Sequence, residues 1–344
     1  MSVLNSPLTS AAKTAESLLS LHIMHTRIAQ VMAELNTLIY PGSQDSLMLV
    51  CGPTGVGKST LARHLVREAN KTMSVQMEAD AGLIPAVYVE APASGESDFS
   101  WRLFFSRILA QLEGGVSAPK TAYGVDPETG RMVRPRMLSN DTLAGLRTGV
   151  ERALKARGTR FVVIDEAAHI IRQSRSKRLE IQLDTLKSLA NACGVQLVLA
   201  GSYDLYRLMS LSGQLARRSH VLHFERYRED HDTDLRAFRA CVQKFQNELP
   251  HLWGERLLSY SSALHENTLG CVGTLSAVLT RAAKMAEQAG SFSEDALRRA
   301  LLTEAQRKQI LEEILEGEAA INPCLTRTMP KLPHVAGQRA RSAA

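Results

Sequence analysis

The sequence predicts an α/β core, built on a five-stranded and mostly parallel sheet, followed by a small all-α domain. Two patterns predict this architecture. Up to residue 228, short apolar runs alternate with amphipathic stretches, which is the order that parallel sheets with covering helices produce. From residue 229 to residue 317 every periodic stretch is helical. Hydrophobic residues make up 44% of the 344 positions, so a sizeable core can be buried.

A helical lead-in is expected before the core, within residues 1–46. Apolar side chains recur at roughly helical spacing over residues 14–39, and Pro41-Gly42 ends the pattern. The next apolar run, at 47–51, predicts the first strand of the sheet. We therefore expect the core to span residues 47–228.

The segment after the first strand has the pattern G-x-x-x-x-G-K-[ST] of a phosphate-binding loop, followed by a predicted helix. Its residues are Gly52, Pro53, Thr54, Gly55, Val56, Gly57, Lys58 and Ser59, and then Thr60. Glycines let backbone N–H groups turn toward phosphate oxygens, and the helix N-terminus adds partial positive charge. We expect this segment to bind ATP, with Lys58 reaching the β- and γ-phosphates and Ser59 ligating Mg²⁺.

A long insertion interrupts the alternation between the second and third strands. The second strand is expected at 85–90 and an amphipathic helix at 99–109. Residues 113–140 then hold many glycines and prolines, which is typical of a long loop, and such loops are often functional. Asp141 is expected to cap the next helix, which runs to about residue 157.

Two carboxylates, Asp165 and Glu166, end the third predicted strand, at 160–164. Carboxylate oxygens suit Mg²⁺, and we expect Asp165 to hold the metal mostly through water. Glu166 is placed to orient and polarise the water that attacks ATP. Many buried strands end in an acid, so the prediction of an ATPase site depends on the phosphate-binding loop upstream.

Polar residues also flank the last two predicted strands, at 195–200 and 220–224. Ser202 either senses the γ-phosphate or the attacking water, or simply opens a turn. One of Arg217 and Arg218 either reaches the γ-phosphate of a neighbouring subunit, as a catalytic arginine finger, or the two form a solvated basic pair. The sequence does not choose between the two arginines.

The C-terminal third is predicted to be a helical domain at 229–317 and a tail. Its helices are expected near 230–248, 254–266, 272–289 and 293–317. From residue 322 on, the chain holds prolines and basic residues but no acid, and we expect a basic, disordered tail at 318–344.

Together these motifs resemble those of the AAA+ ATPases, over roughly residues 15–317. In that family's terms, 52–59 is the Walker A motif, 161–166 the Walker B motif, Ser202 the sensor-1 position and the helical domain the lid. The order resembles more closely the transposition regulators TnsC and TniB, which are related to MuB. The lead-in that ends in a Pro-Gly turn is one feature of this closer resemblance. Three short stretches also carry it: Asp165-Glu166-Ala167-Ala168-His169, Leu199-Ala200-Gly201-Ser202 and Gly270-Cys271-Val272-Gly273-Thr274-Leu275.

The resemblance implies a role in DNA transposition. Such proteins assemble on double-stranded DNA as ATP-dependent rings or helical filaments, pass the target site to a transposase, and disassemble when ATP is hydrolysed. The implied partners are double-stranded DNA, further copies of the chain, transposase subunits, and a target-selection protein or CRISPR-type complex. One feature departs from the family pattern. Many AAA+ lids carry a sensor-2 arginine where Gly273 and Thr274 stand, and Arg281 lies two turns further along.

Two groups of basic residues are candidates for contact with DNA phosphates, or are simply solvated loops. Non-specific duplex binding needs only cations aligned with phosphates, and no recognition helix stands out. The net charge of +6 permits such a partner. The first group has no acid among its residues and follows the third strand, and the second lies in the insertion among acidic residues. The groups are Arg172, Arg175, Lys177 and Arg178, and Lys120, Arg131, Arg134 and Arg136.

Several other classes of protein fit the sequence less well. A replication-initiator or helicase-loader ATPase is the nearest alternative, and a secretion-system ATPase is a more distant one. No apolar run is long enough for a membrane span, and the five cysteines show no C-x-x-C pair, so neither zinc nor disulfides are expected. We expect a cytoplasmic protein. The adenine contacts are less defined, with His25 and Arg27 as candidate neighbours.

Overall fold

The sheet of the core contains five strands in the order β2-β5-β6-β1-β7, and every pairing is parallel. The predicted sheet is therefore confirmed. The strands are β1 (Leu47–Cys51), β2 (Ala86–Glu90), β5 (Phe161–Asp165), β6 (Gln196–Gly201) and β7 (Ser219–His223). The computed structural model describes residues 14–40, 46–93, 95, 98–113, 124–125, 132–133, 142–172, 176–210 and 219–325.

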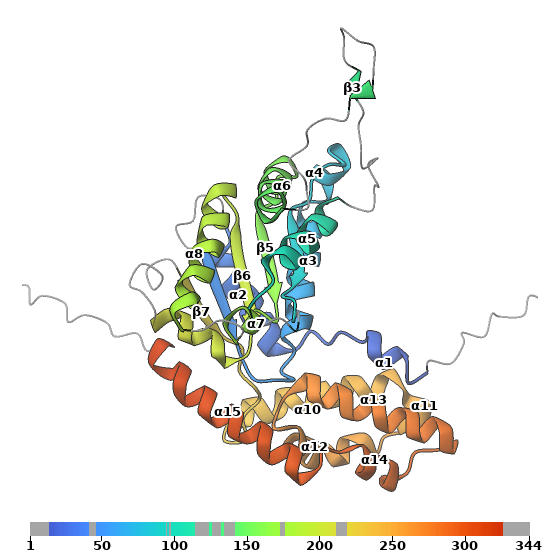
Figure 1. Cartoon of the computed structure of the whole chain (residues 1–344). Coiled ribbons are helices and arrows are strands. Elements are labelled where there is room, and N and C mark those ends of the chain that lie inside the picture. The colour runs from blue at the N-terminus through green and yellow to red at the C-terminus, as the bar shows by residue number, and fades with distance from the viewer. Residues whose placement is uncertain are drawn as a thin grey trace, which may run out of the picture.

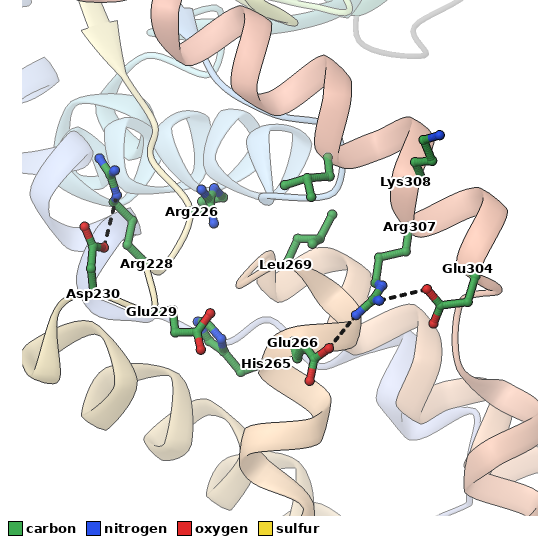
Figure 2. A pocket seen from close by; sticks show the side chains of 11 residues that line it. Arg226, Arg228, Glu229, Asp230, His265, Glu266, Leu269, Glu304, Arg307 and Lys308 are labelled. Carbon is green, nitrogen blue, oxygen red and sulfur yellow. Dashed lines mark hydrogen bonds and ion pairs between the residues drawn. The ribbon is translucent and has the colours of Figure 1, made fainter.

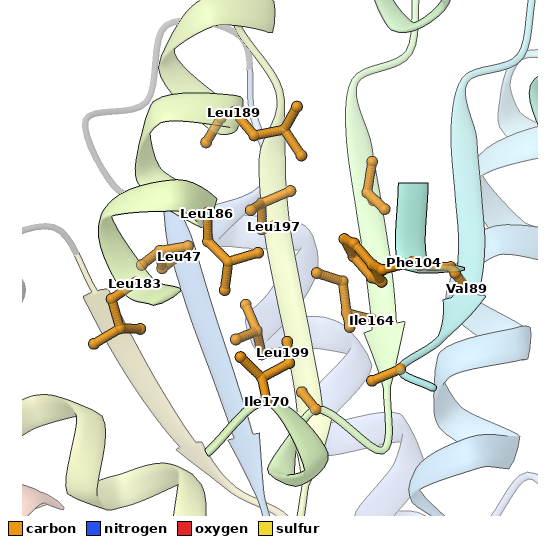
Figure 3. Close-up of a cluster of buried hydrophobic side chains, with 14 of the residues drawn as sticks. Leu47, Val89, Phe104, Ile164, Ile170, Leu183, Leu186, Leu189, Leu197 and Leu199 are labelled. Atoms are coloured by element: carbon orange, nitrogen blue, oxygen red, sulfur yellow. The ribbon is translucent and has the colours of Figure 1, made fainter. Parts of the chain in front are cut away.

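Helices cover both faces of this sheet (Figure 1). Leu47 and Leu49 belong to the cluster under α5 (Trp101–Leu112), α6 (Leu143–Ala156) and α8 (Ser176–Cys193), part of which Figure 3 shows. Met48 and Val50 belong to the cluster on the opposite face, under α2 (Thr26–Leu38) and α3 (Lys58–Thr72). Because successive side chains point to opposite faces, a strand buried on both sides appears in the sequence as a continuous apolar run.

The helical lead-in contains two helices separated by an extended stretch. It consists of a short α1 (Ser17–Ser20), an extended stretch at 21–25, and α2. Leu18 and Ile23 are buried in the cluster of the helical domain, whereas Ile28 is buried against the sheet. One straight helix cannot reach both clusters, so the chain extends between them, and the lead-in bridges the two parts of the protein.

The helical domain forms a separate cluster around the fully buried Trp253. The helix expected at 293–317 is two helices, because the side-chain amide of Asn267 donates to the carbonyl of Leu302 and accepts from its N–H. The domain contains α10 (Asp232–Glu248), α11 (Pro250–Trp253), η2 (Leu257–Tyr260), α12 (Ser261–Thr268), α13 (Val272–Ala289), α14 (Glu294–Ala300) and α15 (Glu304–Leu325).

The last helix, α15, leaves the helical domain and returns to the core, where it contacts β7 and the 3₁₀ segment η1 (Tyr203–Ser210) (Figure 1). Ile321 is fully buried in the core cluster, and Gly317 lies directly against the ring of Tyr203. The helix expected to end near residue 317 therefore continues to Leu325. The remaining residues of the expected tail, 326–344, lie outside the described ranges.

The remaining elements are short. Thr142, and not Asp141, caps α6, because its hydroxyl accepts from the N–H of Gly145; Asp141 lies outside the described residues. A short α4 (Ser74–Ala79) has no buried residue and therefore no apolar periodicity to predict it. In the insertion, β3 (Gly124–Val125) pairs antiparallel with β4 (Met132–Val133). Within the described ranges, no helix combines the length and apolar character of a membrane crossing.

Candidate nucleotide-binding site

The phosphate-binding loop joins β1 to α3 at the carboxyl edge of the sheet. Gly55 has φ +79° and Gly57 has φ +115°, and both values lie in the left-handed region where side chains with a Cβ are strained. These two residues turn the backbone sharply, so that α3 begins at Lys58 directly after the loop. The predicted order of strand, loop and helix is therefore present, with glycine where the backbone requires it.

Lys58 is held inside its own loop. Its ammonium donates to the carbonyl of Gly52 at 2.9 Å and to that of Pro53 at 2.8 Å. Burial lowers the pKa of Lys58, and the nearby carboxylates of Glu166 and Asp165 oppose this shift. The lysine of the loop is thus electrostatically coupled to the two acids that end β5.

Asp165 is almost fully buried, with 2% of its surface exposed. One carboxylate oxygen, Oδ2, accepts from the hydroxyl of Tyr88 at 2.8 Å, and Oδ1 accepts from the N–H of Glu166 at 2.9 Å. Both oxygens are therefore held by hydrogen bonds from neighbouring groups. A carboxylate fixed in this way is suited to hold a metal ion at a defined place.

Glu166 differs from Asp165 in exposure and in backbone conformation. Its side chain is exposed, and its φ of +50° is unusual for a residue other than glycine. The chain beyond it is held by the N–H of Ala167, which donates to the carbonyl of Ala200 on β6 at 2.9 Å. Strained residues of this kind persist where the surroundings fix them and cluster at functional sites.

Ser202 follows β6 and belongs to a small polar network. Its hydroxyl accepts from Arg172 at 3.1 Å and donates to Asp204 at 3.2 Å, and Arg172 also pairs with Asp204 at 2.7 Å. The structure thus brings Arg172, which the sequence groups with DNA-contacting cations, against the predicted sensor residue. Half of the Arg172 side chain stays exposed, at 53%.

The helical domain touches the phosphate-binding loop through its backbone. The N–H of Thr274, in the first turn of α13, donates to the carbonyl of Gly55 at 3.0 Å. A Cβ added to Gly273 would lie 2.6 Å from the same carbonyl oxygen, so only glycine permits this approach. Arg281 is held elsewhere, because its guanidinium donates to the carbonyl of Ala300. The contact of α13 with the loop therefore involves no arginine at the expected sensor-2 position.

His25 of the lead-in packs on Phe224, which in turn lies beside Gly52 and Gly57 of the loop. Its ring stacks on Phe224 with centroids 6.1 Å apart, and its Nδ1 lies 2.9 Å from the hydroxyl of Tyr227. Burial is the main cause that lowers the pKa of His25 to about 4, so the ring is neutral at pH 7. Arg27 instead pairs with Asp234 at 2.9 Å and ties the lead-in to the helical domain. Of the two expected adenine neighbours, His25 packs on Phe224, whereas Arg27 is held by the carboxylates of Glu225 and Asp234.

The other predicted site residues are not placed in detail. The two arginine-finger candidates and most of the DNA-contact candidates lie outside the described residues: Arg217, Arg218, Lys120, Arg131, Arg134, Arg136 and Arg175. Lys177 and Arg178 lie in the first turn of α8. Their roles remain predictions.

The donor groups at this edge of the sheet fit Mg²⁺. Ser59 offers a hydroxyl at the start of α3, and Asp165 offers a fixed carboxylate. Mg²⁺ keeps several waters and is commonly bound by one or two protein oxygens together with phosphate oxygens. Among the described residues, no three His, Cys, Asp or Glu side chains gather into a metal cage, and Mg²⁺ at a phosphate site needs none.

A separate cavity of about 620 Å³ lies between the connection after β7, α12 and α15 (Figure 2). Its charges balance one another. Arg307 pairs with Glu266 at 2.6 Å and with Glu304 at 2.7 Å, and Arg228 lies 3.4 Å from Asp230. None of the residues predicted to bind ATP lines it. The cavity therefore does not belong to the nucleotide site.

Two contacts at the site could not be predicted from the sequence. Tyr88 lies in an ordinary apolar strand, and nothing in its spacing marks it as the partner of Asp165. The meeting of Thr274 with Gly55 depends on how two domains pack. The Gly273-Thr274 pair carries a faint signal, because a glycine in the first turn of a helix is unfavourable without a packing reason.

Comparison with known proteins supports the interpretation of this site as one that binds a nucleotide. A family model described as "AAA domain" matches residues 42–209. The ORC2 protein of Aeropyrum pernix, solved in ADPNP–ADP complexes, shares 19% identity with a TM-score of 0.52, covering 86% of this chain and 70% of its own. A Walker-type ATPase of Pyrococcus abyssi shares 15% identity with a TM-score of 0.53, covering 89% and 78%.

No curated protein matches the chain in sequence. At identities below 25%, the two solved structures establish a shared fold and no more. The family match covers the stretch that carries the phosphate-binding loop, the two acids after β5 and Ser202, and the likeness of fold continues through the helical domain. Residues 42–209 of this protein are therefore similar to an AAA domain.

Proposed function

We propose that the protein is a Mg²⁺-dependent ATPase that oligomerises on double-stranded DNA, without sequence preference, and regulates DNA transposition. The observation that carries the ATPase part is the geometry at the carboxyl edge of the sheet, where Lys58 is bonded to the carbonyls of its own loop and Asp165 is held by two hydrogen bonds at the end of β5. ATP hydrolysis needs a loop that binds phosphate, an acid that holds the metal and an acid that acts on water. The loop and the two acids, one buried and one exposed, are present here.

Each residue at the site has a distinct task in this proposal. The loop at 52–60 binds the phosphates, and Lys58 turns its ammonium from the loop carbonyls toward them. Ser59 and Asp165 hold Mg²⁺, which supplies positive charge against the phosphate oxygens. The exposed carboxylate of Glu166 orients a water molecule and accepts its proton as the water attacks. Arg217 or Arg218 of a neighbouring copy would complete the site, and hydrolysis would then depend on assembly.

Binding to DNA is supported by charge and by resemblance. The segment 172–178 has four cations and no acid, and the whole chain carries a net charge of +6. Cations aligned with phosphates give affinity for any duplex. The part that concerns transposition, with a transposase and a target-selection partner, rests on the likeness to TnsC and TniB. In this role ATP favours the assembly on target DNA, and hydrolysis releases it.

The test is an ATP-dependent gel shift on random duplex DNA, followed by negative-stain imaging. We expect retardation with ATP and Mg²⁺, weak retardation with ADP, and rings or filaments on the DNA. Changing Arg175, Lys177 and Arg178 together to Ala should weaken binding and reduce the slope of log K against log salt by about 0.9 per lost phosphate contact.

A matched control removes three exposed cations elsewhere. Arg298, Arg299 and Lys308 lie in the helical domain with side chains 74%, 66% and 80% exposed, and each pairs with an acid on its own helix. Changing these three to Ala alters net charge equally and should leave the salt slope unchanged. Equal affinities and slopes for the wild type and the first variant would contradict the assignment of 172–178 to DNA.

A replication-initiator type of ATPase is a second candidate, because the fold resembles the ORC2 protein of Aeropyrum pernix over 86% of this chain. The two functions differ in what assembles. A transposition regulator should form continuous rings or filaments on random duplex. An initiator should instead prefer a particular DNA sequence over random duplex, which competition between duplexes in the same gel shift would reveal.

A further inference from the structure

One side chain connects three elements of the nucleotide site. Tyr88 lies on β2, its hydroxyl donates to Asp165 on β5 at 2.8 Å, and the guanidinium of Arg63 on α3 lies 5.3 Å from the centroid of its ring. The helix α3 begins with Lys58, so Arg63 belongs to the helix that starts at the phosphate-binding loop. Tyr88 therefore lies between the helix that starts at the loop and the buried acid of β5.

The hydroxyl of Tyr88 is a proton donor under all ordinary conditions. Burial first, and then the nearby charge of Asp165, raises the pKa of Tyr88 to about 12. The bond to Asp165 therefore joins a neutral donor to a carboxylate, which makes it stronger than a bond between two neutral groups.

This bond leaves room for a metal ion on the carboxylate. Each carboxylate oxygen has about two acceptor sites. On Asp165 one site of Oδ2 is taken by Tyr88 and one site of Oδ1 by the N–H of Glu166. One site on each oxygen remains for a metal-bound water, and the two existing bonds together fix the plane of the carboxylate.

The ring and the hydroxyl of Tyr88 have separable tasks. The ring packs against the cluster beneath α2 and α3, as any aromatic side chain of that size would. Core packing does not require a hydroxyl, and a phenylalanine would fill the same space. The hydroxyl of this half-buried side chain is directed at the carboxylate expected to hold Mg²⁺, which corresponds to the outer-shell partners that orient metal ligands.

We propose that Tyr88 is a positioning residue for the metal: its hydroxyl holds Asp165 in the orientation that receives hydrated Mg²⁺, and Arg63 steadies its ring from α3. This inference rests on the proposed ATPase function. It adds β2 to the elements that form the site, beside the loop after β1 and the two acids at the end of β5.

The test is Tyr88→Phe, with a fluorescent N-methylanthraniloyl ATP as the probe. In EDTA the variant should bind the probe within about twofold of the wild type, because the loop at 52–60 is untouched. The gain in affinity on adding MgCl₂ should fall about tenfold, the lower end of the effect of losing an outer-shell partner. The Mg²⁺ concentration that gives half-maximal hydrolysis should rise by a similar factor, with kcat largely restored at saturating Mg²⁺.

Two further variants separate positioning from packing. Tyr260→Phe removes a hydroxyl from a half-buried tyrosine of the helical domain and should change neither Mg²⁺ dependence nor nucleotide affinity. Arg63→Ala should move the Mg²⁺ midpoint in the same direction as Tyr88→Phe but less, because the hydrogen bond to Asp165 stays.

The outcomes distinguish this inference from the function on which it rests. A wild type whose affinity for the probe does not respond to Mg²⁺ overturns both. A wild type that responds, with a Tyr88→Phe variant that keeps the whole response, overturns the role of Tyr88 alone. A variant that loses affinity equally in EDTA and in Mg²⁺ has lost packing around the loop, and this result also overturns the inference.

Discussion

Replacing Glu166 with glutamine is expected to stop ATP hydrolysis while ATP binding persists. Glutamine keeps the size and shape of the side chain but cannot accept a proton from water. General-base catalysis contributes about 10²–10⁴-fold to such reactions, so kcat should fall by that factor. On DNA, the variant should form the ATP-dependent assembly and fail to take it apart.

The structure explains why binding should survive this change. The groups expected to hold phosphate and metal are the loop at 52–60 and Asp165, and the side chain of Glu166 is exposed beside them. Glu166 contributes to Asp165 only through its backbone N–H, which glutamine also has. The strained φ of +50° is equally unfavourable for either residue, so folding should be unaffected.

Phosphate release in the steady state and binding of the fluorescent nucleotide measure the two activities separately. Glu78→Gln is the matched control, because Glu78 is also exposed and lies in α4, which has no buried residue. That variant should behave as the wild type. A Glu166→Gln protein that keeps more than half of the hydrolysis rate, or one that no longer binds nucleotide, would show that Glu166 has another role.

The sheet and the loop were predictable because local chemistry determines them. A strand such as β5 is buried on both faces and is apolar up to its last residue, Asp165, which Glu166 follows directly. The phosphate-binding loop needs glycine at positive φ, lysine and a hydroxyl at fixed spacing. These constraints lie within a few consecutive residues, so the sequence alone reveals them.

Features that depend on distant partners were not predictable in the same way. The lead-in has helical spacing throughout, yet Ile23 and Ile28 are buried in different clusters, and only the arrangement of the two domains breaks the helix between them. The continuation of α15 past residue 317 depends on Tyr203, against which Gly317 packs. Tyr88 reaches Asp165 only because β2 pairs with β5, a pairing between segments that are far apart in the sequence.

Gly270 links α12 to α13, and replacing it with alanine is expected to destabilise the helical domain strongly. Its φ is +72°, and a Cβ added there would lie 1.9 Å from the carbonyl oxygen of Tyr227. That carbonyl already lies 2.9 Å from Nε2 of His265, and the N–H of Tyr227 donates to the carbonyl of Gly270 at 3.1 Å. An alanine at this position must therefore separate two segments that are hydrogen-bonded to each other, and moving either segment breaks these bonds.

Gly290 provides a control with the same backbone conformation and free space. Its φ is +74° at the end of α13, and a Cβ added there meets no atom within 4 Å. Gly290→Ala should therefore lower the free energy of unfolding by only about 1–2 kcal/mol, the cost of placing a Cβ in the left-handed region. Gly270→Ala should lower the free energy of unfolding by the same amount and by about 1–3 kcal/mol more, because the added Cβ overpacks the contact with Tyr227. Urea unfolding of the two variants measures the difference.

The same substitution should reach the nucleotide site, because α13 begins just after Gly270 and meets the phosphate-binding loop in its first turn. A displaced α13 loses the bond from Thr274 to Gly55 and leaves the loop without its contact to the helical domain. Nucleotide affinity of the folded Gly270→Ala protein should then change, whereas that of Gly290→Ala should not, since Gly290 lies at the opposite end of the helix. Equal stabilities of the two variants would show that the structure accommodates a Cβ beside Tyr227 at no cost. Equal nucleotide affinities would show that the position of α13 does not affect the phosphate-binding loop.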